Sequence, residues 1–286
     1  MDKFTRRALL KASMTGVAAM AVPSLAPGLE ITARKGRIHQ SVCQWCYPNL
    51  SLDQLSESAA KIGLSGVDLL HPDEFEVPRR YGLVCTMGLV GGGEIEKALN
   101  RVENHAAIEQ AYRVNIPRAV KAGVPNVITF SGPRAGMSDE EGAKNTIAGL
   151  NRVKKIGEDH GVNICLELLN SKRDHPDYMC DHTAWGVRVV EEVNSPNVKL
   201  LYDIYHMQIM EGDLIETIRR NIQWIGHFHT GGVPGRHELD ETQEVQWATV
   251  MRAIADAGFR GYVAHEFEPT GDPLASLRKA VDLCDV

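Results

Sequence analysis

The sequence predicts one α/β domain of the (β/α)8-barrel (TIM-barrel) type, covering residues 37–286. Three observations favour this fold class. Eight short apolar segments alternate with longer segments of helical spacing, which is typical of a parallel sheet with crossover helices. The apolar segments are nearly continuous, as expected for strands that are buried on both faces. Eight such units in about 250 residues match the usual size of a closed barrel.

The predicted strands are short runs rich in aliphatic and aromatic residues. They cover Ile38–Cys43, Gly66–Leu70, Leu83–Met87, Asn126–Phe130, Asn163–Leu168, Lys199–Asp203, Trp224–His229 and Tyr262–Phe267. The predicted helices lie between and after these strands, at Leu52–Ile62, Glu103–Ala122, Ser138–His160, His182–Val193, Asp213–Asn221, Trp247–Ala257 and Pro273–Leu283.

Residues at the helix ends agree with these boundaries. Ser51 precedes Gln54, and Ser138 precedes Glu141, by the three residues that a capping box requires. Glycine, which favours the left-handed conformation that ends a helix, follows four of the predicted helices, at Gly63, Gly123, Gly161 and Gly258. An open doubly wound sheet is the alternative fold, but its glycine-rich phosphate motif is missing after the first strand. The Gly91–Gly93 cluster follows the third strand and is interpreted as a flexible loop.

Composition and charge restrict the classes of function. Hydrophobic residues make up 43% and charged residues 24% of the chain, as in ordinary soluble proteins. The formal net charge of −6 argues against a nucleic-acid partner, which requires a basic face. Six cysteines are too few for a disulfide framework, and Cys43 and Cys46 lack the second pair of a zinc site. We expect these cysteines to serve packing, and the sequence leaves open whether the chain forms a homo-oligomer.

The first 36 residues are set apart from the domain. Thr5–Lys11 contains paired arginines and precedes the weakly apolar stretch Ala12–Val22. This pattern resembles a twin-arginine export signal, with Ala19–Ala21 as a candidate cleavage site. We therefore expect an exported, periplasmic protein. The alternative is a disordered or helical extension on a cytoplasmic enzyme.

Polar residues stand at the ends of the last four predicted strands. The spacing between successive residues is about one strand–helix unit in the series Glu167, Asp203, His229 and Glu266. Because the strand ends of a barrel converge at one mouth, we expect these side chains to lie together at similar depth. Three carboxylates repel one another strongly unless a cation lies between them. We therefore predict that the four residues bind one divalent ion, with Mn²⁺, Mg²⁺ or Co²⁺ favoured over Zn²⁺ by the oxygen-rich ligand set.

Neighbouring polar residues are candidates for supporting roles. Strand alternation places His227 on the same face as His229, where it can support the ligands, and turns His265 away from the site. Four residues that follow the same strands are predicted to bind substrate: His206, Arg236, Asn170 and Lys172. Among these, Arg236 suits a substrate carboxylate best, because a guanidinium binds carboxylates through parallel hydrogen bonds. Trp45, after the first strand, is a candidate for the pocket lining.

Three segments resemble the hydroxypyruvate isomerase family, which belongs to the xylose isomerase-like barrels. They are Glu167–Asn170, Tyr202–Gln208 and Ala264–Phe267, of which the second is the most specific. The resemblance runs from about Ser41 to the C-terminus. It implies a single divalent ion held by the four strand-end residues predicted above.

The same resemblance implies a reaction. Glu167 and Glu266 correspond to the catalytic acid and base that move a proton between neighbouring carbons, while the metal polarises the substrate oxygens. We expect a small keto acid or ketose as substrate, in first place hydroxypyruvate, which becomes tartronate semialdehyde (2-hydroxy-3-oxopropanoate) through an enediolate. The hydroxypyruvate enzymes of the family have Gln where this chain has His229, whereas the ketose 3-epimerases have His.

Three alternatives remain open. The first is a ketose 3-epimerase or another sugar isomerase, which His229 favours. The second is DNA repair like that of endonuclease IV, a relative of the same barrels, but it requires more metal ligands and a basic track for DNA. The third, from another class, is an exported barrel that binds a sugar without catalysis. Such a binder has no use for two positioned glutamates.

Overall fold

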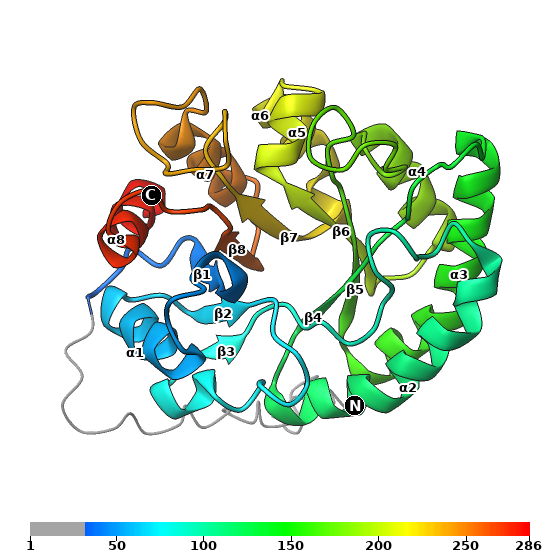
Figure 1. The fold of residues 1–286 in the computed structure, drawn as a ribbon, viewed down its shortest axis with the longest axis horizontal. Coiled ribbons are helices and arrows are strands. Elements are labelled where there is room, and N and C mark those ends of the chain that lie inside the picture. The colour runs from blue at the N-terminus through cyan, green and yellow to red at the C-terminus, as the bar shows by residue number, and fades with distance from the viewer. Residues whose placement is uncertain (1–31) are drawn as a thin grey trace, which may run out of the picture.

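The computed structural model describes residues 32–286, which form a closed barrel of eight parallel strands with helices around it (Figure 1). The strands are β1 (His39–Cys43), β2 (Gly66–Asp68), β3 (Val84–Cys85), β4 (Asn126–Thr129), β5 (Asn163–Glu167), β6 (Val198–Asp203), β7 (Ile225–Thr230) and β8 (Tyr262–His265). Their hydrogen-bonded order is β3-β2-β1-β8-β7-β6-β5-β4. Gly88 closes the barrel, because its N–H donates to the carbonyl of Asn126 (2.9 Å) and its carbonyl accepts from Ile128 (3.2 Å). The predicted (β/α)8 fold is confirmed.

The described residues form eight α-helices and four short 3-10 helices. The α-helices are α1 (Leu52–Ile62), α2 (His105–Ala122), α3 (Asp139–His160), α4 (Thr183–Val193), α5 (Ile204–Met210), α6 (Leu214–Asn221), α7 (Trp247–Asp256) and α8 (Pro273–Cys284). The 3-10 helices are η1 (Gln44–Cys46), η2 (Pro78–Tyr81), η3 (Val102–Asn104) and η4 (Ile222–Trp224). All seven predicted helices are present, with ends within two residues of the prediction.

Helix α5 was not predicted, for a local reason. Asp203 is at once the last residue of β6 and the N-cap of α5, where its carboxylate accepts the N–H of His206 at 3.2 Å. No loop residue therefore marks the start of the helix. The predicted caps behave as expected elsewhere: Ser51 and Gln54 form a complete capping box, and Ser138 accepts the N–H of Glu141.

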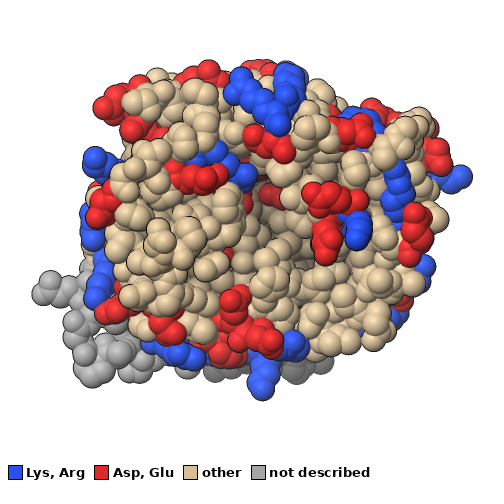
Figure 2. Space-filling view, viewed as in Figure 1, with Lys and Arg blue, Asp and Glu red and all other residues tan. Residues whose placement is uncertain are grey.

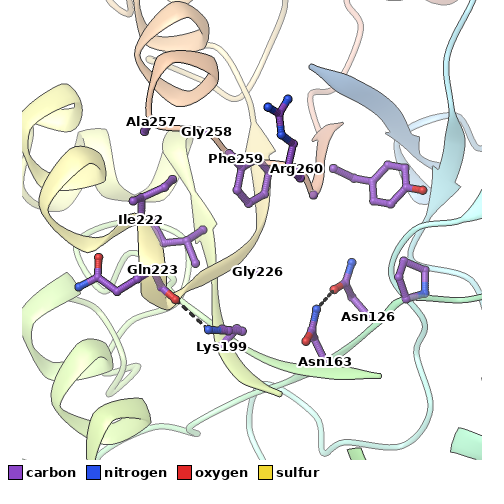
Figure 3. A pocket seen from close by; sticks show the side chains of 14 residues that line it. Asn126, Asn163, Lys199, Ile222, Gln223, Gly226, Ala257, Gly258, Phe259 and Arg260 are labelled. Atoms are coloured by element: carbon purple, nitrogen blue, oxygen red, sulfur yellow. Dashed lines mark hydrogen bonds between the residues drawn. The ribbon is translucent and has the colours of Figure 1, made fainter. Parts of the chain in front are cut away.

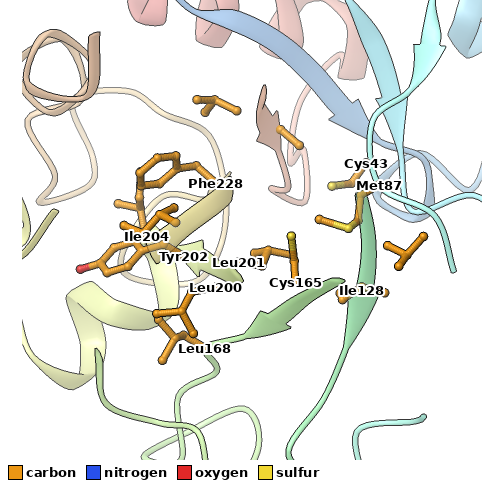
Figure 4. Close-up of a cluster of buried hydrophobic side chains, with 14 of the residues drawn as sticks. Cys43, Met87, Ile128, Cys165, Leu168, Leu200, Leu201, Tyr202, Ile204 and Phe228 are labelled. Atoms are coloured by element: carbon orange, nitrogen blue, oxygen red, sulfur yellow. The ribbon is translucent and has the colours of Figure 1, made fainter. Parts of the chain in front are cut away.

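Apolar side chains fill the interior of the barrel. Figure 4 shows Cys43, Ile128, Cys165 and Leu201, from four different strands, gathered there with Met87, which follows β3, and each is almost completely buried. Such close packing makes the strands a rigid support for the residues at their ends. All six cysteines are free and buried, which agrees with the packing role that we expected for them.

Residues 32–36 lie against the barrel, although we expected them to belong to the N-terminal segment 1–36 that precedes the domain. The N–H of Thr32 donates to the carbonyl of Lys61 at 3.3 Å, and that of Lys35 to Asp285 at 2.9 Å. The twin-arginine motif itself lies outside the described residues. Within residues 32–286, no helix has the length and apolar character that a membrane span requires.

The amino ends of β4, β5 and β6 open onto a cavity of about 520 Å³ (Figure 3). Two hydrogen bonds join residues that line it: Asn163 donates to Asn126 at 2.9 Å, and Lys199 donates to the carbonyl of Gln223 at 2.8 Å. None of the predicted site residues lines this cavity. The predicted site lies at the opposite, carboxyl ends of the strands, where the active sites of such barrels are found.

Candidate metal centre

Glu167, Asp203, His229 and Glu266 come together at the carboxyl ends of four consecutive strands. Each offers one ligand atom, and these atoms all lie within 4.8 Å of one another. All four side chains are buried, with exposed fractions from 0% for Asp203 and His229 to 5% for Glu167. The face of the molecule in Figure 2 is hollowed near its middle, with acidic and basic side chains in the hollow. The structure thus brings together the four residues that the sequence singled out.

The four residues reach the same place from different rows of the sheet. Asp203 pairs with His229, but Glu167 pairs with Leu201, and Ala264 pairs with His229. Equal register along the four strands is therefore not what aligns them. Strands in a closed barrel are staggered, so side chains at one height come from shifted rows.

His229 presents its Nδ1 atom to all three carboxylates. This atom lies 2.7 Å from Oε2 of Glu266, 3.4 Å from Oε1 of Glu167 and 4.0 Å from Oδ2 of Asp203. Although Nδ1 of His229 and Oε2 of Glu266 are close, neither has an aligned hydrogen-bond partner among the described residues. Buried polar atoms without partners are rare in proteins. Three carboxylates and one imidazole nitrogen are a ligand set for a divalent ion, and the four residues fit such an ion.

Asp68, at the end of β2, holds His229 from the other side. Its Oδ2 atom lies 2.9 Å from Nε2 of His229 and 3.1 Å from Nε2 of His227. Burial disfavours the charged carboxylate, but these two histidines outweigh burial and lower the pKa of Asp68 to about 2. The contact keeps the proton of His229 on Nε2 and leaves Nδ1 for a metal. Asp68 was not among the predicted site residues, although a carboxylate in the apolar run 66–70 is an available signal.

Arg236 lies over the cluster. Its Nη2 atom is 2.6 Å from Oε2 of Glu266 and 3.4 Å from Oδ2 of Asp203. The guanidinium carbon lies 5.2 Å from the ring centre of Trp45 and 5.3 Å from that of Tyr205, within the range of cation–π contacts. Nη1 of Arg236 makes no hydrogen bond to any residue from 32 to 286. The arginine is therefore held by carboxylates and aromatic rings while one amino group stays available.

The charges around the site move the carboxyl pKa values apart. Burial raises the pKa of Glu167, and it raises the pKa of Asp203 to about 7. Glu266 is also buried, but the positive charges of Arg236 and His229 outweigh burial and hold its pKa well below the usual range. Burial alone disfavours the protonated form of His229, yet Glu266 and the other carboxylates raise its pKa well above the usual value. Two carboxyl groups whose pKa values are moved apart in this way suit the roles of an acid and a base.

His206 supplies a hydrogen-bond donor beside the cluster. Its Nδ1 atom faces two N–H groups of Asn170, the backbone N–H at 3.2 Å and the side-chain amide at 2.7 Å. Nδ1 must therefore accept, and the proton resides on Nε2. Nε2 is buried without a hydrogen-bond partner and lies 3.6 Å from Oδ2 of Asp203. Burial lowers the pKa of His206 well below its usual value, so the ring is a neutral donor.

Two residues predicted to bind substrate form hydrogen bonds with other groups of the protein. The ammonium group of Lys172 donates to the carbonyls of Ile209 and Met210, both at 2.9 Å, and so stabilises the C-terminal end of α5. Asn170 is completely buried, and its amide binds His206 and the loop that follows. Both residues therefore support the structure of the site, and the contact with substrate that we expected of them stays a prediction. His265 turns away from the centre and binds Gln40 at 2.8 Å, as strand alternation predicted.

Residues 49–285 match the model of the family described as "Xylose isomerase-like TIM barrel", and the chain belongs to this family. It is 26% identical over 250 residues to a human protein named "Putative hydroxypyruvate isomerase", a match that covers 82% of this chain and 90% of the relative. It is also 26% identical over 236 residues to a 2-oxo-tetronate isomerase from Pectobacterium atrosepticum, covering 75% and 86% of the two chains.

A solved structure from Brucella melitensis, described as an AP endonuclease of family 2, has the same fold. It superposes with a TM-score of 0.77 at 23% identity and covers 84% of this chain and 97% of its own. At this identity the likeness shows the fold alone. Together, the family match and the buried centre define the chain as an isomerase or epimerase of sugars or keto acids, with a Glu/Asp/His cluster consistent with a divalent metal site.

Proposed function

We propose that this chain isomerises hydroxypyruvate to tartronate semialdehyde. The observation that carries the proposal is the buried pair Glu167 and Glu266, whose carboxylates lie 3.4 Å and 2.7 Å from Nδ1 of His229 within one candidate metal centre. The relatives named for hydroxypyruvate and 2-oxo-tetronate add support, since both names describe isomerases of short keto acids.

The two glutamates are suited to different halves of the proton transfer. Glu266, whose pKa is held low, takes the proton from C3 of hydroxypyruvate, and Glu167, whose pKa is raised, returns one to C2. The proton of the C3 hydroxyl group moves to the C2 oxygen, so the product has the composition of the substrate. Glu266 then releases its proton to solvent and Glu167 takes one up, which restores both groups. A bound dication would supply polarisation of the substrate oxygens and stabilise the charge of the enediolate.

Two further side chains hold the substrate in this proposal. The free Nη1 of Arg236 binds the carboxylate of hydroxypyruvate, while its Nη2 stays on Glu266. The Nε2–H of His206, which has no hydrogen-bond partner within residues 32–286, donates to a substrate oxygen. A neutral imidazole in this position polarises an oxygen without repelling the metal.

The decisive experiment measures the turnover of hydroxypyruvate by purified residues 32–286 with added Mn²⁺, beside a Glu266→Gln control. We expect turnover that requires metal and is lost in the control. Absence of turnover, with Mn²⁺ still bound, would overturn hydroxypyruvate as the substrate.

A ketose 3-epimerase is the second candidate. His229 favours it, because the epimerases that this chain resembles have His at this position. The same preparation should then interconvert ketoses that differ at C3 and leave hydroxypyruvate unchanged.

A further inference from the structure

A pocket of about 370 Å³ lies directly beside the metal centre. It is bounded by residues 45–50, which follow β1, and by residues that follow β8, namely Glu268, Pro269 and Pro273. We refer to it as the Trp45 pocket. Trp45 also belongs to the centre, because its indole Nε1 donates to Oε1 of Glu266 at 2.7 Å. One side chain is thus shared by the pocket and a proposed catalytic glutamate.

Trp45 is unusually exposed for a residue in this position. Its exposed fraction is 41%, and it is the only aromatic residue among the large exposed hydrophobic side chains of residues 32–286. Arg236 covers part of the ring but does not line the pocket, so the pocket meets a different part of the indole. An exposed aromatic ring that is anchored at its N–H group offers a rigid apolar surface to a ligand.

The remaining walls combine apolar surface with free polar groups. Leu50, Pro269 and Pro273 are apolar residues of the lining, while its residues Asn49 and Glu268 carry an amide and a carboxylate. The side chains of Asn49 and Glu268 make no hydrogen bond to any described residue. A ligand here needs an apolar face for Trp45 and hydroxyl groups for the amide and carboxylate. A pyranose ring has both, because its C–H groups form apolar faces and its hydroxyl groups lie around the edge.

Hydroxypyruvate does not fill this pocket. In the proposed function its three carbons lie on the metal side of Trp45, between Arg236 and His206. We propose that the Trp45 pocket binds a sugar ring attached to the reacting keto compound, so that the chain also acts on keto sugars that carry a glycosyl substituent. This inference rests on the proposed function for the position of the reacting carbons and extends its substrate class.

The first test measures binding without turnover. Methyl β-D-glucopyranoside has no carbonyl group, and saturation-transfer NMR detects its binding to the protein. We expect strong signals with the wild-type protein, weaker signals with Asn49→Ala, which removes the amide but leaves the pocket open, and loss of signal with Asn49→Trp, which fills it. No signal with the wild-type protein, or an equal signal with both variants, would overturn the pocket as a sugar site.

The second test compares two keto sugars that differ only in a glucosyl group, D-fructose and isomaltulose, with metal-loaded protein. We expect kcat/KM to be at least about tenfold higher for isomaltulose, with the ratio reduced to about one in Asn49→Trp. Equal values for both sugars in the wild-type protein would overturn the extended substrate class. Glucoside binding that Asn49→Trp abolishes, in a protein that turns over no keto compound, would uphold the pocket and instead contradict the proposed function.

Discussion

The carboxylate of Asp68 lies 2.9 Å from Nε2 of His229 and joins β2 to β7 across the interior of the barrel. These strands are not neighbours, because β1 and β8 lie between them in the sheet. The contact orients a predicted metal ligand and selects the nitrogen atom that faces the three carboxylates. A residue 161 positions earlier in the chain thus determines the chemistry of His229.

Replacement of this carboxylate should weaken metal binding. We predict that Asp68→Asn raises the Kd for Mn²⁺ about 10- to 100-fold, because the amide no longer holds His229 in its orientation and tautomer. Titration calorimetry measures the effect. His265→Gln is the matched control, since it alters a buried histidine that faces away from the centre. An equal loss of Mn²⁺ affinity in both variants would point to general destabilisation and contradict the specific role of Asp68.

Substitution of Glu266 and of Glu167 should block different proton-transfer steps of the reaction. At saturating Mn²⁺, we predict that Glu266→Gln loses about 10²- to 10⁴-fold in turnover and no longer exchanges the C3 hydrogen of hydroxypyruvate with D₂O. Glu167→Gln should lose turnover but retain part of this exchange, because the base that opens the reaction is intact. NMR follows both processes in one sample. Retained exchange in Glu266→Gln would exclude it as the base.

Metal affinity should rise with pH. In the metal-free protein burial raises the pKa of Asp203 to about 7, and the carboxylates raise the pKa of His229. Below these values both groups hold protons that a metal must displace, and above them the ligands are free. We predict that the Kd for Mn²⁺ decreases between about pH 6 and pH 8, with proton release that calorimetry in buffers of different ionisation enthalpy detects. A Kd independent of pH over this range would refute the prediction.

Arg236 should distinguish acidic from neutral substrates. We predict that Arg236→Lys raises KM for hydroxypyruvate about tenfold or more, because an ammonium group cannot reproduce the paired contacts of the guanidinium. KM for a neutral ketose should change much less. Steady-state kinetics with both substrates provide the comparison. Similar increases in both KM values would show that Arg236 maintains the shape of the site and does not recognise the substrate carboxylate.

The N-terminal residues 1–36 allow a separate prediction about export. We propose that residues 1–36 direct export through the twin-arginine route, because Arg6 and Arg7 precede a weakly apolar stretch. These residues, fused to a folded reporter in a bacterium, should carry it to the periplasm. Substitution of both arginines by lysine should retain the reporter in the cytoplasm. Export that survives this substitution would contradict the assignment.

Much of the fold could be predicted because its signals are local. Alternating apolar runs and helical spacings, together with caps such as Ser51 and Gln54, identified seven helices with ends close to those observed. Helix α5 escaped prediction because Asp203 ends a strand and caps a helix at once. The four residues of the candidate metal centre could be singled out because each lies at or next to the carboxyl end of a strand, and in a barrel these ends meet at one mouth.

Lys172 and Asn170 show where such reasoning stops. Both follow β5 at positions from which a side chain can reach the centre. In the structure Lys172 binds the end of α5 and Asn170 supports His206. The position of a residue after a strand does not determine where its side chain points. Competing partners, such as the carbonyls at a helix end, come within reach only in the folded chain.

The sequence by itself determined the barrel, its eight strands and the residues of the candidate metal centre, because periodicity and residue type act over short stretches of chain. Only the tertiary structure decided how these residues are arranged. The stagger of the strands aligned Glu167 with Glu266. Asp68 binds Nε2 of His229 and leaves Nδ1 facing the carboxylates, and the guanidinium group of Arg236 packs against the ring of Trp45. Each of these contacts joins residues far apart in the chain, and its geometry exists only when the closed barrel brings them within a few ångströms of one another.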